Sequence, residues 1–146
     1  MKKTSLNKPA KDKKKVSEKT GMLPGSLYYV GKKRDDESIV SIINYSSEEF
    51  EEKQVKKIEE CLAYRFSNSI SWIDVEGIHN IELIDAMGLQ YGLHPLILED
   101  IVNTEQRTKL EEYENELFLI LKFLKYNKET MAVEAEQISL VLGKIM

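Results

Sequence analysis

The sequence has 146 residues, of which 42% are hydrophobic and 32% are charged, and its formal net charge is −4. This composition is typical of one soluble globular domain, and no stretch approaches the roughly 20 apolar residues that a membrane-spanning helix needs. Cys61 is the only cysteine, so disulfides within the chain are excluded and a reducing compartment is indicated.

Residues 1–20 differ from the rest of the chain. They hold eight lysines against Asp12 and Glu18 and have no aromatic residue. Such a segment buries too little apolar surface to fold, so we predict a disordered Lys-rich arm. No apolar stretch follows the lysines, which excludes a secretory signal. We interpret the arm as a solubilising tail, in preference to a contact with acidic lipid or nucleic acid.

The first half of the folded part begins with a Gly- and Pro-containing turn at residues 21–25. Residues 27–30 and 39–44 are predicted to form a strand and its returning partner, joined by a charged hairpin loop. Ser46 is followed by Glu49 at the spacing of a capping box, which predicts a helix from Ser47 to about Leu62.

The second half alternates strand and helix patterns. Residues 71–77 alternate in polarity and predict a strand. Asn80 can cap a helix that Gly92 ends, and Pro95 suits the first turn of a short, largely buried helix in the segment 94–102. Further strands are predicted at 109–113, 116–126 and 134–143. The middle one is apolar on both faces, so we expect it to be central.

These elements predict an α/β (α+β) fold with a mixed parallel and antiparallel sheet. Helices would flank both faces of that sheet, giving an α/β/α sandwich. The domain would span residues 21–146. Because the sequence stops directly after a predicted strand, we expect this domain to be truncated at its C-terminal end.

Motifs for nucleophilic catalysis, phosphate binding and zinc binding are absent, so we do not expect an enzyme. His79 and His94 could each act as a metal ligand or a base. We favour capping or hydrogen bonding for both, because no second His or Cys stands at ligand spacing. Asp74 and Glu76 share one strand face, which we interpret as solvated rather than cation-binding. Cys61 follows two glutamates and is interpreted as an inert thiol.

Glu99 and Asp100 are adjacent carboxylates inside the apolar segment 94–102. Burying them costs free energy unless solvent, a cation or a basic side chain compensates their charge. Their oxygens suit Mg²⁺, although two carboxylates are too few for a dedicated cage. The alternative is an ion pair with Arg107, Lys109 or another lysine. Composition alone slightly favours the ion pair.

Several motifs resemble the amino-terminal cytoplasmic domain of CorA-type magnesium and cobalt transporters. The resemblance runs from about residue 21 to the end of the sequence, and its motifs keep their order. They are Gly-Met-Leu-Pro-Gly at 21–25, Trp-Ile-Asp-Val-Glu-Gly-Ile-His at 72–79, Gly-Leu-His-Pro-Leu-Ile-Leu-Glu-Asp-Ile at 92–101, Gln-Arg-Thr-Lys at 106–109 and Glu-Gln-Ile-Ser-Leu-Val-Leu at 136–142.

The resemblance implies a regulatory domain of a homopentameric ion transporter on the cytoplasmic face of the cell membrane. In that family divalent cations bind between subunits and hold the channel closed when intracellular Mg²⁺ is high. Asp100, and less directly Glu99, would be the metal ligands, with Mg²⁺ or Co²⁺ as a regulatory rather than catalytic ion. The stalk, the transmembrane helices and the Gly-Met-Asn pore motif are missing, so this fragment would be soluble and would not itself transport ions.

The partners implied are other subunits of the same transporter and divalent cations, with no nucleic acid. Membrane contact would come only through the missing C-terminal part. The alternative function is a stand-alone α/β protein-interaction module that keeps the fold without transport.

Overall fold

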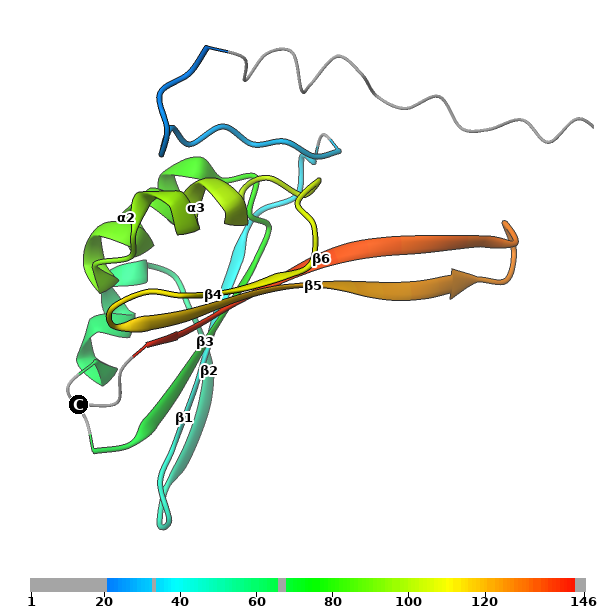
Figure 1. The fold of residues 1–146 in the computed structure, drawn as a ribbon. Coiled ribbons are helices and arrows are strands. Elements are labelled where there is room, and N and C mark those ends of the chain that lie inside the picture. Colours follow the sequence, from blue (N-terminus) through cyan, green and yellow to red (C-terminus); the bar gives the residue numbers. More distant parts are fainter. Residues whose placement is uncertain (1–20, 33, 66–67, 144–146) are drawn as a thin grey trace, which may run out of the picture.

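The structure is a computed structural model that describes residues 21–32, 34–65 and 68–143. The predicted disorder of residues 1–20 lies outside this range. The elements, in chain order in Figure 1, are β1 (Ile39–Tyr45), β2 (Phe50–Val55), the 3-10 helix η1 (Ile58–Tyr64), β3 (Ile70–Glu76), α2 (Ile81–Tyr91), α3 (Pro95–Ile101), β4 (Lys109–Glu112), β5 (Glu116–Asn127) and β6 (Ala132–Gly143).

The first sheet has the strand order β2-β1-β3, and both of its strand pairs are antiparallel. One face is apolar because Val40 and Ile42 of β1 lie beside Val55 of β2. That face packs against η1, through Ile58 and Cys61, and against side chains of α2. Ile42 and Cys61 are completely buried, so this cluster forms one of the centres of the core.

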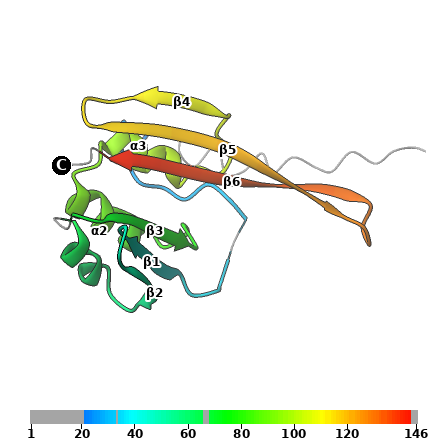
Figure 2. The same cartoon turned by 90° about the horizontal axis from the view of Figure 1, so that it is seen from below.

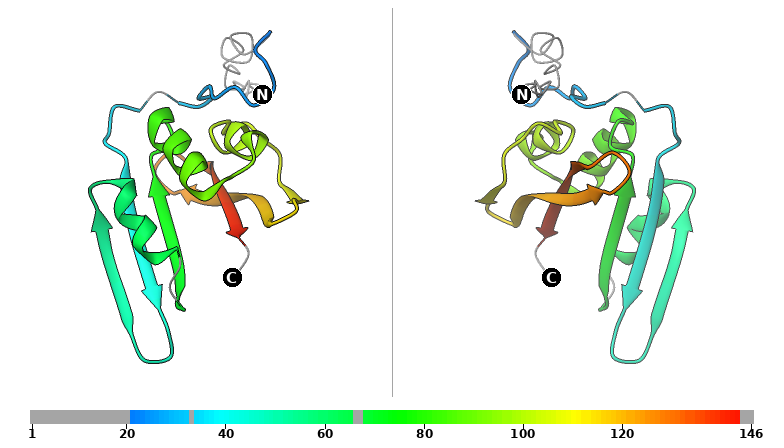
Figure 3. Two further views of the ribbon diagram at one scale, coloured as in Figure 1. Left: turned by 90° about the vertical axis from the view of Figure 1, so that its left-hand side faces the viewer. Right: turned by 90° about the vertical axis from the view of Figure 1, so that its right-hand side faces the viewer.

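The second sheet has the order β4-β5-β6 and is also antiparallel. The prediction that β5 is central is therefore confirmed. Phe118 and Ile120 of β5 are completely buried and pack against Ile97 of α3. Figure 3 shows the same arrangement, with α2 beside the first sheet and α3 beside the second.

The two α-helices begin and end where the sequence predicts. The Asn80 side chain accepts a hydrogen bond from the Leu83 amide at the start of α2. Gly92 ends α2 in the left-handed conformation, with φ of 69°. His94 caps α3, and Pro95 occupies its first turn. These signals are local, which is why they can be read from the sequence.

Replacing Gly92 by alanine is expected to lower the free energy of unfolding by about 1 kcal/mol, because a residue with a Cβ is strained at this φ. Nothing lies within 4 Å of the position that the Cβ would occupy, so the cost would come from the backbone alone. Gly92→Asn is the matched control and should cost less, since asparagine tolerates the left-handed region. Urea denaturation measures both free energies of unfolding, and equal decreases for Gly92→Ala and Gly92→Asn would contradict this explanation.

The predicted fold class is wrong. The described residues form two antiparallel three-stranded sheets with short helices, rather than a mixed sheet with helices on both faces. The parallel contact in the structure is an isolated bridge between Val30 and Asn103. This bridge also shows that residues 27–30 do not form the predicted hairpin with β1. The helices α2 and α3 lie together on one side of the strands in Figure 1.

The predicted helix from Ser47 to Leu62 is also wrong, because its first part is β2 and its last part is η1. The Ser46 hydroxyl does accept hydrogen bonds from the amides of Glu48 and Glu49, but it does so in the turn between β1 and β2. A serine can satisfy nearby amides in a turn as well as at a helix start. The capping-box spacing therefore did not distinguish the two structures.

The face of the second sheet that points away from α3 is apolar and largely exposed. Figure 2 shows this sheet in front of α3, with its near side uncovered. Its exposed side chains, taken from alternate positions on the three strands, are Leu110, Leu117, Leu121, Phe123, Ile138 and Leu142. In the described part of the chain, no helix is long and apolar enough to cross a membrane.

Candidate functional site

The short helix α3 is anchored by its apolar side chains. Ile97 is completely buried against β5, and Leu98 packs beside Ile84 of α2. Val102, directly after the helix, is also completely buried. This packing fixes the rotation of α3 and leaves Glu99 and Asp100 partly buried at the surface.

Asp100 is held by two side chains from the segment that follows α3. Its Oδ2 atom lies 2.6 Å from Nζ of Lys109 on β4, and its Oδ1 atom accepts a hydrogen bond from the Gln106 amide. The Asp100 side chain is 14% exposed. Of the two predicted possibilities, the ion pair is therefore confirmed for Asp100, with Lys109 as its partner.

Glu99 points toward the segment that precedes the first sheet. Its Oε2 atom accepts a hydrogen bond of 2.6 Å from the backbone amide of Gly25. A side chain at position 25 would crowd this contact, because its Cβ would lie 3.0 Å from Cβ of Pro95. Glu99 thus links Gly25 to α3.

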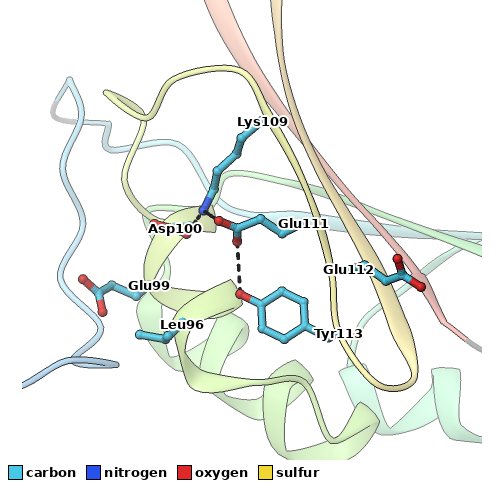
Figure 4. A pocket seen from close by; sticks show the side chains of 7 residues that line it. All are labelled: Leu96, Glu99, Asp100, Lys109, Glu111, Glu112 and Tyr113. Atoms are coloured by element: carbon cyan, nitrogen blue, oxygen red, sulfur yellow. Dashed lines mark hydrogen bonds and ion pairs between the residues drawn. The ribbon is translucent and has the colours of Figure 1, made fainter.

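A surface pocket of about 430 Å³ lies between α3 and β4. Figure 4 shows its lining side chains, which are Leu96, Glu99, Asp100, Lys109, Glu111, Glu112 and Tyr113. Four of these residues are carboxylates and one is a lysine, so the pocket is acidic overall. It is open to solvent on one side and backed by the buried ring of Phe118, which lies 5.6 Å from Nζ of Lys109.

Lys109 is the centre of the charge network in this pocket. Its Nζ atom contacts Asp100 and also lies 2.8 Å from Oε1 of Glu111. Burial alone would lower the pKa of Lys109, but its hydrogen bonds to the two carboxylates raise the pKa above its usual value. The hydrogen bond from Lys109 lowers the pKa of Glu111, against the effect of burial, and Tyr113 lowers it further. Lys109 is therefore charged at neutral pH.

The backbone of α3 is hydrogen-bonded to a side chain of the second sheet. The side-chain amide of Gln137 on β6 donates to the carbonyl oxygens of Asp100, at 3.2 Å, and Ile101, at 3.4 Å. Lys122 on β5 in turn donates to Oε1 of Gln137 and to the carbonyl of Thr104. These bonds satisfy carbonyl groups at the end of the helix, and they position Asp100 relative to the sheet.

Two carboxylates, those of Asp100 and Glu111, converge in the pocket, and their oxygens are the donor type that a hard divalent cation prefers. Glu99 and Glu112 point away from them. A positive charge, the Lys109 ammonium, already lies between the two converging carboxylates. The number of converging ligands is smaller than a closed site needs. Within residues 21–32, 34–65 and 68–143, no three His, Cys, Asp or Glu side chains come together as a metal site.

The other predicted residues lie elsewhere and have structural contacts. Nδ1 of His94 accepts a hydrogen bond from the Leu96 amide, and Nε2 of His79 lies 2.9 Å from the Asp36 carbonyl oxygen, so the capping and hydrogen-bonding interpretations are confirmed. Asp74 and Glu76 are both exposed on β3. Burial, and then Glu60, raise the pKa of the Cys61 thiol, which agrees with an inert cysteine.

Sequence reasoning missed Glu111 and the role of Gln137. Glu111 had a usable signal, since Lys109 and Glu111 are two residues apart on a predicted strand and so point to the same face. Gln137 lies far from α3 in the sequence, and its contact depends on how β6 is placed under the helix.

The comparisons with known proteins agree on one family. The family model described as CorA-like Mg²⁺ transporter protein matches residues 67–145. The cobalt/magnesium transport protein CorA of Thermotoga maritima is 43% identical over 133 residues. That alignment covers 91% of this chain and 38% of the relative, so the chain corresponds to a minor part of the relative's length. Since the family model matches more than half of the sequence, the chain belongs to the CorA-like Mg²⁺ transporter family.

Proposed function

We propose that this chain is the cytoplasmic regulatory domain of a CorA-like magnesium and cobalt transporter, in which Asp100, with Glu99, contributes to divalent-cation sites where subunits meet. The transporter would be a homopentamer in the cell membrane, with this domain on the cytoplasmic face. The regulatory ion would be Mg²⁺, with Co²⁺ as a second candidate, and its occupancy would control the gating of the channel.

The observation that carries this proposal is the position of Asp100. Its carboxylate is only 14% exposed, yet it lines an acidic pocket that opens to the surface. Its carboxylate has one lysine and one amide as partners, and the carboxylate of Glu111 lies on the same side of the pocket, bound to the same lysine. An incomplete set of oxygen ligands at a surface is what a site shared between two subunits requires of each of them.

Electrostatics gives the site a regulatory consequence. Two acidic surfaces that face each other repel by about 1–4 kcal/mol per pair of unit charges at about 4 Å, depending on the local dielectric. A bound divalent cation supplies the positive charge that offsets this repulsion. Asp100 would therefore favour the arrangement of subunits in which its pocket faces another acidic surface only when the cation is present.

The test is a titration with Mn²⁺, a paramagnetic substitute for Mg²⁺, followed by electron paramagnetic resonance of the free ion. The wild-type chain is expected to bind Mn²⁺ weakly, because few protein ligands are offered. Asp100→Asn should weaken binding by about tenfold or more, which corresponds to about 1.4 kcal/mol. Asp85→Asn, which removes an exposed carboxylate from α2, is the matched control and should leave binding unchanged.

A second measurement addresses the subunit boundary. Sedimentation of the wild-type chain should show a higher average mass with Mg²⁺ than without it, and Asp100→Asn should abolish the difference. The proposal fails if the wild-type chain binds no Mn²⁺, or if Asp100→Asn and Asp85→Asn behave alike.

A further inference from the structure

Lys109 places an ammonium group where a cation bound to Asp100 would lie. Its Nζ atom is 2.6 Å from Oδ2 of Asp100 and 2.8 Å from Oε1 of Glu111. The Lys109 side chain is 26% exposed, so part of it already contacts solvent. The second oxygen of Asp100 is occupied by the Gln106 amide. Any ion that approaches the Oδ2 side of Asp100 therefore meets the ammonium first.

We propose that Lys109 is a tethered cation that competes with divalent ions for Asp100, and so sets both the affinity and the charge selectivity of this pocket. The inference rests on the proposed function and adds a regulatory residue to it. Lys109 does not contact the ion in this proposal, since it competes by occupying the carboxylate oxygens that the ion needs.

The competition follows from the charges. Asp100 and Glu111 share one ammonium, so the local group of three side chains keeps one net negative charge. A monovalent ion that replaced the ammonium would restore the same charge and would gain nothing electrostatically. A divalent ion brings one additional positive charge, which offsets the remaining carboxylate. Exchange is therefore favourable for divalent ions and not for monovalent ones.

The surroundings of Lys109 allow the exchange. Its ammonium lies 5.6 Å from the ring of Phe118, and its two carboxylate partners come from different elements, α3 and β4. Glu111 keeps a hydrogen bond from the Tyr113 hydroxyl, at 3.1 Å, when Lys109 leaves. Asp100 keeps its bond to Gln106. Both carboxylates thus remain oriented after the lysine has moved toward solvent, since neither depends on the lysine alone.

Competition also separates this account from a purely structural ion pair. If the pair only stabilises the fold, removing Lys109 lowers stability and leaves Mn²⁺ affinity unchanged. If Lys109 competes with the ion, its removal raises the affinity, because the pocket then has carboxylates without their internal cation. Stability and affinity therefore move independently, and both can be measured on the same protein.

The experiment compares Mn²⁺ binding by four proteins, with electron paramagnetic resonance as the readout. Lys109→Gln removes the charge and should bind Mn²⁺ about tenfold more tightly than wild type, a change of about 1.4 kcal/mol. Lys109→Arg keeps a charged partner for the carboxylates and should stay within about twofold of wild type. Lys125→Gln, the control, removes a charge from an exposed position on β5 outside the pocket and should also stay within about twofold.

Adding Asp100→Asn to Lys109→Gln should abolish the gain. A second readout is the unfolding temperature, which should rise more with Mn²⁺ for Lys109→Gln than for wild type. If Lys109→Gln binds no more tightly than wild type while Asp100→Asn still weakens binding, the competition is refuted and the proposed function stands. If none of the proteins binds Mn²⁺, both are refuted.

Discussion

Replacing Phe118 by alanine is expected to lower the free energy of unfolding by about 3–5 kcal/mol. The ring is completely buried and joins Ile97 of α3 to Ile120 of β5. Its loss would remove the apolar contact that holds α3 on the second sheet and would leave a cavity beneath the acidic pocket. The expected cost is a large part of the stability of a typical domain, so a second transition or a loss of folding at 37 °C would agree with it.

The matched control is Phe123→Ala on the same strand. Phe123 is 54% exposed on the opposite face of β5, so its truncation should cost less than about 1 kcal/mol. Urea denaturation of both variants measures the difference in the free energy of unfolding, provided that the two have the same m-value. Similar losses for the two would show that α3 is not held through Phe118.

Raising the pH from about 10 to about 12 is expected to destabilise the wild-type protein more than Tyr91→Phe. Burial raises the pKa of Tyr91 to about 12, and the neighbouring Cys61 contributes less. In the unfolded chain a tyrosine ionises near pH 10. The folded state therefore holds one more proton across this window, so stability falls as the pH rises through it. The contribution is complete below pH 10.

A pKa of about 12 in the folded state, against about 10 in the unfolded chain, corresponds to at most about 2.7 kcal/mol, and solvent screening of the half-buried ring reduces this value. Tyr91→Phe should lose this dependence and should cost about 1 kcal/mol at pH 8, where the hydroxyl donates to the Cys61 carbonyl at 3.3 Å. Tyr126→Phe, at an exposed position on β5, should behave as wild type. The measurement is urea denaturation at three pH values. An unchanged alkaline slope in Tyr91→Phe would contradict the assignment.

The parts of the fold that could be predicted are those with local signals. Asn80 and Gly92 delimit α2, and Pro95 starts α3, because each satisfies or ends a helix through its own chemistry. The β5–β6 hairpin follows from two strand patterns and a short turn. By contrast, the Ser46 signal suits both a turn and a helix, and the choice was made by the pairing of β2 with β1.

The sheet arrangement has no comparable local signal. Nothing in a strand pattern says whether its neighbour is parallel or antiparallel, and the prediction of a mixed sheet rests on interpreting the middle helices as crossovers between strands of one sheet. The strands on either side of those helices, β3 and β4, instead belong to different sheets. The candidate site likewise has a part that the sequence indicates locally and a part that it does not. Glu99 and Asp100 could be singled out because carboxylates are costly in an apolar segment. Lys109 could be named as one of several possible partners of these carboxylates, but the choice among them, and the contact of Glu99 with Gly25, depend on chain paths that only the folded structure determines.

The bonds from Gln137 to the carbonyls of α3 give the long β5–β6 hairpin a mechanical meaning. The hairpin continues well past the helices in Figure 1, and Gln137 lies near the middle of β6, where the supported and projecting halves meet. At that point β6 is hydrogen-bonded to α3. The two hydrogen bonds link the middle of β6 to the last turn of α3, so a shift of the hairpin relative to the helix would stretch them. Such a shift would act directly on the peptide group of Asp100, the residue whose carboxylate lines the acidic pocket.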